Sequence, residues 1–203
     1  MGLQDNSLDT KTRIFNAALR LFAFDGVENA TTRSIANAAG IKSASIYNHY
    51  GSKDEILEDC YKYFADYSSQ LRLTKEEYLP ILKNGTKEEV INIPNYDIPK
   101  DKYENLIYAL IVTFTRIHTD SRARDIYIQN KNNALAYLNE FFETGIEIGR
   151  FARFDYHPVA HAYLIIKLNA AHSVSIEPHG NDHMLENQAK LLRLLISLIP
   201  FCY

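Results

Sequence analysis

The chain has 203 residues, of which 46% are hydrophobic and 23% charged, with a formal net charge of −3. This composition suits one or two folded domains with a sizeable core, and the longest apolar runs fall short of the roughly 18–20 residues that a membrane-spanning helix needs. The first residues lack the cationic and apolar segments of a secretory signal, so we expect a cytoplasmic protein without a membrane partner.

The first two predicted helices are separated by clear turn signals. Residues 9–25 carry apolar side chains three and four apart, and Gly26 suits the position just past a helix C-terminus. Thr31 or Thr32 can then cap a short helix through residues 33–39.

A third short helix is predicted after a glycine turn. Gly40 permits the turn, and residues 42–49 can bury Ile46 while their polar side chains point outward. Ser52 then begins a Ser-x-x-Glu capping box, in which Ser52 accepts the amide of Glu55 and Glu55 reaches back to the Ser52 amide. A long fourth helix should follow, to about residue 71.

The remaining chain is also predicted to be helical. Pro80, Gly85, Pro94 and Pro99 should break residues 72–100 into a turn-rich connection that holds one or two short helices. Helical periodicity returns from residue 101 to about Gly149. Two more helices are expected at about 158–174 and 183–199, which gives an all-α chain of about nine helices.

Two short helices around a glycine turn form the parts of a helix-turn-helix, with Ile35, Ala36 and Ile46 in its small core. Such a unit lays its second helix in the major groove, where Ser and Lys side chains reach base edges or phosphates. Side chains near the following helix start can donate to phosphates, as can the free amides there. The predicted DNA-contacting residues are Thr32, Arg33, Lys42, Ser43, Ala44, Ser45, Tyr47, Asn48, His49, Tyr50 and Lys53.

Two features limit what this surface predicts. For Tyr47, His49 and Tyr50, the alternative is that they only pack the joint between the third and fourth helices. Residues 1–55 contain six Lys or Arg and six Asp or Glu, so we expect modest non-specific affinity that depends strongly on salt. The second helix of the pair carries no Arg, the usual guanine reader, so the preferred bases stay open.

The order of "TTRSIA", "AAGI", "SIYNHY" and "SKDEIL" within residues 12–57 resembles the TetR family of bacterial transcriptional regulators. The resemblance covers about a quarter of the chain. It implies an all-helical homodimer with an N-terminal DNA-binding domain and a larger C-terminal domain for an effector and the dimer interface. It further implies that residues 42–47 contact bases and phosphates and that Lys53 contacts phosphate.

The last predicted helix is apolar almost all round, so it must be covered on more than one side. We expect it to pack on its own domain and, with residues 157–174, on a second subunit; a central helix within a monomer is the alternative. Dimerisation would let two readers meet half-sites about one helical turn apart. The predicted interface residues are His161, Leu164, Ile165, Leu168, Leu191, Leu192, Leu195 and Leu198.

The chain is rich in aromatic side chains, with 14 Tyr and 10 Phe. An apolar ring with a polar tip suits a cavity for a partly apolar small molecule, although an ordinary aromatic core is the alternative for most of these residues. The candidate pocket residues are Phe64, Tyr67, Tyr108, Phe114, His118, Phe142 and Tyr163.

No cofactor or metal is predicted. Cys60 and Cys202 lack the spacing of a disulfide framework or a zinc site, and we expect reduced thiols. Two histidine pairs are four residues apart, but they lie at a helix start and in a loop, where solvated or capping histidines are common. These pairs are His157 with His161 and His179 with His183.

Together these features predict a sequence-specific DNA-binding regulator, a repressor whose operator affinity changes when a small-molecule effector binds. Residues 1–56 would form the DNA-binding domain, and residues 57–203 the effector-binding and dimerisation domain. The partners would be a two-fold symmetric duplex operator, an unidentified effector and a second copy. The alternative is a helical binding module that acts through a protein partner; no enzyme motif is present.

Overall fold

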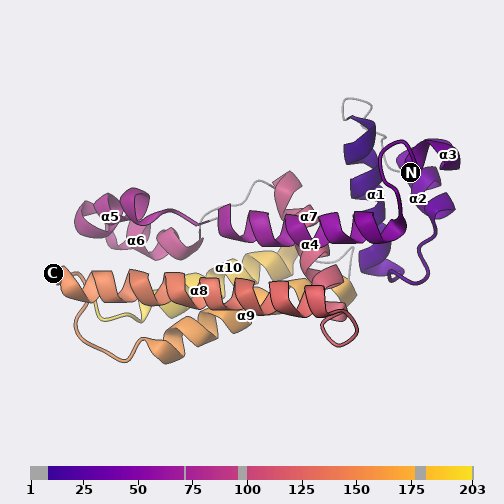
Figure 1. The fold of residues 1–203 in the computed structure, drawn as a ribbon. Helices are drawn as coiled ribbons and strands as arrows, with labels where there is room; N and C mark the ends of the chain where they lie inside the picture. Colours follow the sequence, from indigo (N-terminus) through magenta and orange to yellow (C-terminus); the bar gives the residue numbers. More distant parts are fainter. Residues whose placement is uncertain (1–8, 71, 96–99, 177–181, 203) are drawn as a thin grey trace. The chain divides into compact units, whose positions relative to one another are not determined.

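The computed structural model describes residues 9–70, 72–95, 100–176 and 182–202. For residues 95, 100–103, 168–176, 182–185, 188 and 189 it describes the backbone alone. Within these ranges there is no strand, only an isolated bridge between Phe151 and Phe201, and the all-α prediction is confirmed (Figure 1). No helix in the described part of the chain is long and apolar enough to span a membrane.

The helices follow one another in the predicted order. They are α1 (Thr10–Phe24), α2 (Thr32–Ala39), α3 (Ser43–Ile46), α4 (Lys53–Gln70), α5 (Lys75–Asn84), α6 (Lys87–Asn92), α7 (Lys100–Thr115), α8 (Ser121–Glu147), α9 (His157–Ile176) and α10 (Asp182–Ser197), with a 3-10 turn, η1 (Ile93–Asn95).

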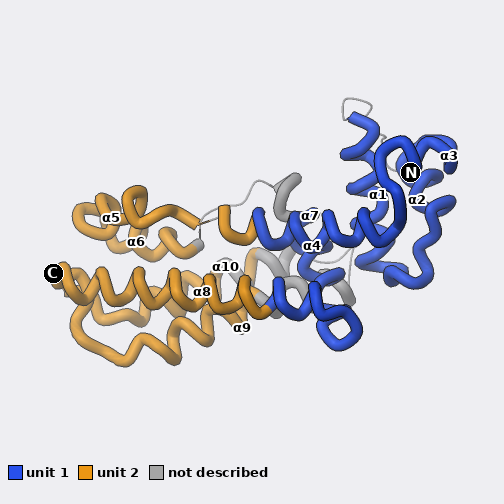
Figure 2. The backbone as a smooth tube through the Cα atoms, in the orientation of Figure 1, with its two compact units in different colours: residues 1–66, 100–127 blue, residues 67–99, 128–203 orange. Residues whose placement is uncertain are grey.

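Two compact units make up the chain (Figure 2). The first contains residues 1–66 and 100–127, and the second residues 67–99 and 128–203. This division follows compactness, so α7 joins the N-terminal helices in the first unit. The functional boundary near residue 56 is a separate matter and stays a prediction.

Side-chain hydrogen bonds position the helices of the helix-turn-helix region, which we call the reader. The Asp9 carboxylate caps α1 by accepting from the Thr12 amide, and Thr31 forms a reciprocal capping box with Ser34 at the start of α2. Arg13 on α1 donates to the carbonyl oxygen of Ala39 at 2.6 Å. A cation at this position satisfies a free carbonyl and complements the helix dipole, so it fixes α1 against the C-terminal end of α2.

The turn between α2 and α3 depends on a left-handed residue. Gly40 has φ 68° and ψ 36°, a conformation in which a side chain is strained. Its amide donates back to Asn37, and the Ile41 amide donates to Ala36. Ile35, Ala36 and Ile46 are fully buried around this turn, as the helix-turn-helix prediction requires.

The capping box at the start of α4 differs in one bond from the prediction. The Glu55 amide donates to the Ser52 hydroxyl at 3.1 Å as expected, but the Glu55 carboxylate accepts from the Gly51 amide at 2.6 Å rather than from Ser52. The Glu55 carboxylate thus accepts from an amide that lies before the helix begins. It therefore ties the turn after α3 to the first turn of α4.

Helix α7 forms the centre of the first unit. Residues 106–113 are all buried, so this stretch of the helix is covered on every side. It packs against α1, where Tyr108 meets Phe24 edge-on at 5.0 Å and Asn105 hydrogen-bonds Asn16.

Aromatic rings form the core of the second unit. Phe141, Phe142 and Phe151 are buried with ring centroids 5.3–6.4 Å apart, and Gly145 leaves the space that the Phe151 ring fills. Two backbone hydrogen bonds hold residues 200–202 beside Phe151. The Ala152 amide donates to the Pro200 carbonyl oxygen, and the Cys202 amide donates to the Arg150 carbonyl oxygen.

The connection after α4 is more regular than predicted. Pro80 lies inside α5 and does not break it. Thr74 with Glu77, and Thr86 with Glu89, form complete capping boxes that start α5 and α6. These two Thr-x-x-Glu signals explain why the segment forms two helices although it contains several residues that disfavour them.

Candidate DNA-binding surface

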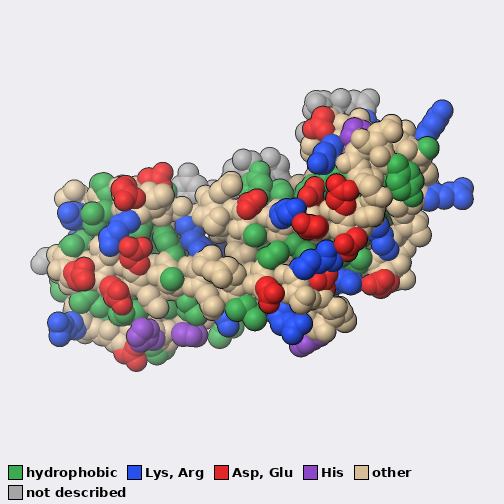
Figure 3. Space-filling model, in the orientation of Figure 1, with side chains coloured by type: hydrophobic (Ala, Val, Ile, Leu, Met, Phe, Trp, Pro, Cys, Tyr) green, Lys and Arg blue, Asp and Glu red, His purple; other side chains and the backbone are tan. Residues whose placement is uncertain are grey.

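Helix α3 is the second helix of the helix-turn-helix, and it exposes side chains that were predicted to face DNA. Lys42, Ser43 and Ala44 are exposed, Ser45 is half-buried, and Tyr47 is 60% exposed although it is a large apolar ring. Asn48 and Arg33 are also exposed, and Thr32 and His49 are half-buried. Figure 3 shows basic side chains projecting from the surface over α2 and α3.

Tyr50 takes the packing role that was the alternative for it. Its side chain is only 2% exposed, and Lys11 lies 5.0 Å from the centre of its ring. Burial, followed by the nearby Asp59 carboxylate, raises the pKa of Tyr50. Tyr50 therefore supports the joint beneath Tyr47, and the exposed contact surface is made by the other residues.

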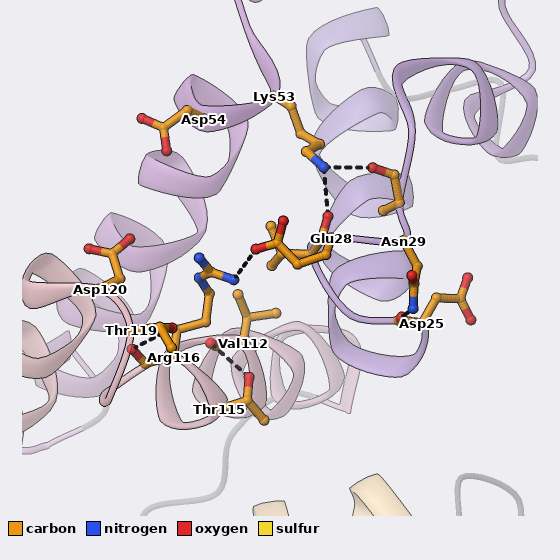
Figure 4. A network of polar contacts seen from close by, with 12 residues as sticks. Asp25, Glu28, Asn29, Lys53, Asp54, Val112, Thr115, Arg116, Thr119 and Asp120 are labelled. Carbon is orange, nitrogen blue, oxygen red and sulfur yellow. Dashed lines mark hydrogen bonds and ion pairs between the residues drawn. The ribbon is translucent and has the colours of Figure 1, made fainter.

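Lys53 is bound within the protein. Its ammonium group donates to the carbonyl oxygens of Val27 and Ala30 at 2.7 and 3.0 Å (Figure 4). These carbonyls belong to the loop between α1 and α2, so Lys53 ties that loop to the first turn of α4. A phosphate contact from Lys53 stays a prediction and would use its remaining donor.

We expect Lys53→Gln to destabilise the protein by about 1–3 kcal/mol because two charge-assisted hydrogen bonds are lost. Urea unfolding measures this. Lys62→Gln on the same helix is the matched control, since Lys62 only forms a surface pair with Glu58 and should change stability by less than about 0.5 kcal/mol. Equal stability of both variants would contradict the tying role.

Ion pairs fix the same reader elements to the turn between α7 and α8. Arg116 donates to the Glu28 carboxylate at 3.0 Å (Figure 4). Arg122 makes a two-pronged contact with Asp54, at 2.9 and 2.8 Å, and also binds Asp120. Tyr61 donates to Asp120 from α4. The loop after α1 and the start of α4 are therefore both attached to residues 116–122.

Because of the ion pairs of Arg122 with Asp54 and Asp120, the free energy of unfolding should decrease at acid pH. Hydrogen bonds from Arg122 are the main cause that lowers the pKa of both Asp54 and Asp120. A lowered folded-state pKa stabilises the protein above the unfolded Asp pKa of about 3.9, and that gain is lost as pH falls through the folded value.

We therefore expect Arg122→Gln to lower Tm by about 2–4 °C at pH 7, which corresponds to about 1 kcal/mol for partly exposed pairs. The difference from the native protein should shrink from pH 4 downward and vanish near pH 2. Arg124→Gln, which removes an exposed charge from the same helix, is the control and should leave Tm unchanged at both pH values. A constant difference for Arg122→Gln would contradict the pairing.

The candidate pocket residues are divided between the two units. Phe64, Tyr108, Phe114 and His118 belong to the first, and Tyr67, Phe142 and Tyr163 to the second. Tyr108 is buried and donates to Glu104, whereas Phe114 is 47% exposed and His118 is exposed. Phe142 is wholly buried in the aromatic core, and Tyr163 is buried and donates to Pro94. Their joint role in an effector pocket stays a prediction.

The predicted interface residues fall into two groups. Ile165 is 67%, Leu191 51% and Leu198 73% exposed, and His161 is exposed with its Nδ1 2.9 Å from the His157 carbonyl. Leu192 is buried in the core of its own unit, and Leu164 and Leu195 pack partly against that core. The side chain of Leu168 lies outside the described residues.

Leu194 is an exposed residue that the sequence analysis missed. With Leu191 and Leu198 it forms a stripe at spacings of three and four on α10, and it is 58% exposed. An open groove of about 500 Å³ between α6 and α10 borders this stripe. The buried residues Leu192, Ile196 and Ile199 have the same three-four spacing, so the sequence pattern alone does not separate the two faces.

Metal ligation finds no support in the described residues, which contain no group of three or more His, Cys, Asp or Glu that could hold an ion. His157 and His161 are both exposed. The side chains of His179 and His183 lie outside the part of the chain that the structure describes.

The fold and the exposed second helix define a helix-turn-helix protein. Residues 14–60 match the family described as "Bacterial regulatory proteins, tetR family". Relatives are the negative regulator IcaR of the biofilm operon icaADBC in Staphylococcus epidermidis, 38% identical over 61 residues, and the repressor KstR2 of Rhodococcus jostii, 39% identical over 56.

These curated relatives match over a limited part. The alignments cover 28% of this chain in both cases, and 33% of IcaR and 28% of KstR2. Solved structures extend the likeness of the fold to the whole chain. A transcriptional regulator from Saccharomonospora viridis in complex with choline has a TM-score of 0.68 at 18% identity, covering 93% of this chain and 96% of that one. KstR2 of Mycobacterium tuberculosis has a TM-score of 0.64 at 20% identity, covering 95% of each.

Proposed function

We propose that this protein is a dimeric, sequence-specific DNA-binding repressor whose operator affinity is changed by a small-molecule effector. The observation that carries the proposal is the exposed surface of α3, where Tyr47 and Lys42 project beside small side chains on a reader held rigidly by Gly40 and Arg13. Small residues let a helix backbone approach base edges, and the projecting side chains can reach bases or phosphates.

The contact residues proposed for DNA are Thr32, Arg33, Lys42, Ser43, Ala44, Ser45, Tyr47, Asn48, His49 and, for phosphate, Lys53. Tyr50 is left as a supporting residue because it is buried. The names of the relatives, among them a negative regulator and a repressor, favour repression over activation for proteins with this reader. A reader of chromosomal operators would act in the cytoplasm.

Dimerisation follows from the apolar side chains that α9 and α10 leave uncovered within one subunit. Ile165, Leu191, Leu194 and Leu198 are all exposed, and clustered exposed aliphatic side chains are typical of an interaction surface. A second copy would cover them and place two readers on one duplex, which multiplies a weak half-site affinity.

The salt dependence of DNA binding tests the proposal against the partner-protein alternative. A groove reader should prefer one duplex over others and lose affinity steeply between 50 and 200 mM salt, by about 10³-fold or more if some six phosphates are contacted. Fluorescence anisotropy with duplexes enriched by selection measures both. Equal weak binding to every duplex would favour a module that acts through a protein partner.

A further inference from the structure

A cation lies among tyrosine rings in the second unit. Arg72 lies two residues after the end of α4, and its guanidinium carbon is 5.7 Å from the centre of the Tyr137 ring on α8. On α9, the Lys167 ammonium is 5.7 Å from the centre of the Tyr163 ring. The electrostatic influence of Tyr137 and Tyr163 on the Arg72 pKa shows that both phenols lie near this guanidinium.

Two of these groups, the Arg72 guanidinium and the Tyr137 hydroxyl, lack a hydrogen-bond partner among the described residues. Among the described residues, no carboxylate pairs with Arg72, and its contact is the Tyr137 ring face. The Tyr137 hydroxyl is buried without a hydrogen-bond partner. Both residues are half-buried, and burial lowers the pKa of Arg72 and raises the pKa of Tyr137.

The acidic side chains around the cluster are already engaged. Glu140 pairs with Lys75 at 3.1 Å on the surface, and Glu77 accepts from the Thr74 amide in the α5 capping box. Arg72 and Lys167 therefore bring two cationic side chains to the cluster of Arg72, Tyr137, Tyr163 and Lys167. Leu73 and the rings of the second-unit core provide apolar surroundings next to it.

A half-buried guanidinium that no described carboxylate pairs with, and a buried hydroxyl without a hydrogen-bond partner among the described residues, both cost stability. A carboxylate is the group that would complete them. The planar guanidinium donates two parallel hydrogen bonds to a carboxylate, and a phenol can donate a third. A cationic ligand, by contrast, would be repelled.

We propose that Arg72 and Tyr137 bind the carboxylate of a small, partly apolar acid, and that this acid is the effector. The proposal rests on the proposed function only in calling the acid an effector; the binding site does not depend on DNA recognition. Because Arg72 comes two residues after α4, and α4 begins at the reader, an acid held by Arg72 acts on the helix that carries the reader.

Isothermal titration of the full-length protein with benzoate, 4-phenylbutyrate and octanoate, each against its primary amide, tests the site. We expect at least one acid to bind once per subunit and its amide to bind at least tenfold more weakly. Arg72→Gln should weaken the acid at least tenfold and Tyr137→Phe several-fold, since a charge-assisted pair and one hydrogen bond are lost.

The control is Lys75→Gln, which removes a neighbouring exposed charge and should leave affinity unchanged. Arg72→Lys keeps the charge without the fork and should fall between native and Arg72→Gln, which covers the case in which Arg72→Gln folds poorly. Binding of no acid, equal binding of acid and amide, or full affinity in Arg72→Gln and Tyr137→Phe would overturn the site.

The outcomes separate this inference from the proposed function. Acid binding that requires Arg72, in a protein that selects no DNA sequence, would support the site and contradict the repressor. Selection of an operator by a protein that binds none of the acids would do the reverse. Release or tightening of the operator by the bound acid, lost in Arg72→Gln, would support the acid as effector.

Discussion

Replacing Tyr47 with alanine is expected to lower operator affinity by about 2 kcal/mol or more, roughly 30-fold, with little change in stability. The ring is 60% exposed and supports no core, so its loss removes a DNA contact rather than packing. One contact is worth about 1–3 kcal/mol, and a dimer loses it in both half-sites. Anisotropy titration with a selected duplex measures the change.

Two further variants, Tyr47→Phe and Lys42→Ala, separate the contributions of the tyrosine hydroxyl and of the lysine charge to operator affinity. Tyr47→Phe keeps the ring and removes only the hydroxyl, so it reports a phosphate or base hydrogen bond. Lys42→Ala should weaken binding and reduce the salt dependence if the ammonium group contacts phosphate. Native affinity in both Tyr47→Ala and Lys42→Ala would contradict the assignment of α3 as the reading helix.

Leu194→Glu is expected to convert the dimer into a monomer and reduce operator affinity at least 100-fold. The side chain is 58% exposed in one subunit, so the substitution costs the monomer little, but in the dimer it would bury an unpaired carboxylate. Two half-sites would then be bound independently, which removes the gain from linking the readers. Sedimentation over a range of concentrations measures the association state.

Ile128→Glu is the matched control for the dimer. Ile128 is also an exposed aliphatic residue, on α8, and lies outside the proposed interface. This variant should remain a dimer with native operator affinity. If both variants behave alike, the interface does not involve the α10 stripe.

The reader was predictable because its signals are local. A cap at Thr31, a glycine at position 40 and an apolar residue at position 46 each act within one or two helical turns, and each takes the predicted role. The burial of Tyr50 and the bonds of Lys53 to Val27 and Ala30 were not predictable in the same way. They depend on how a loop 23 to 26 residues away returns to α4.

Long-range pairs were missed for the same reason. Arg122 and Asp54 are 68 residues apart, and Arg116 and Glu28 are 88 apart. Nothing in the periodicity of either helix indicates that these charges meet, since each would also suit a solvated surface. The connection after α4 was a different case, because two Thr-x-x-Glu signals for α5 and α6 were present but given less weight than Pro80.

The predicted dimer-interface residues on α10 included both its buried face and its exposed face. An apolar pattern that extends all round α10 cannot distinguish Leu192, which is buried in its own unit, from Leu191 and Leu194, which are exposed. Aromatic composition likewise could not separate the core ring Phe142 from a ligand contact. Arg72, at the start of the connection, gave no periodic signal, and what marks it is that no described carboxylate pairs with it.

Selection of bound fragments from a random duplex pool tests the central claim most directly, with the native protein and Tyr47→Ala carried through in parallel. The account predicts enrichment of a two-fold symmetric motif by the native protein, with half-sites about one helical turn apart, and no enrichment by the variant. Failure of a well-folded native dimer to enrich any motif would contradict the claim that this protein reads DNA sequence.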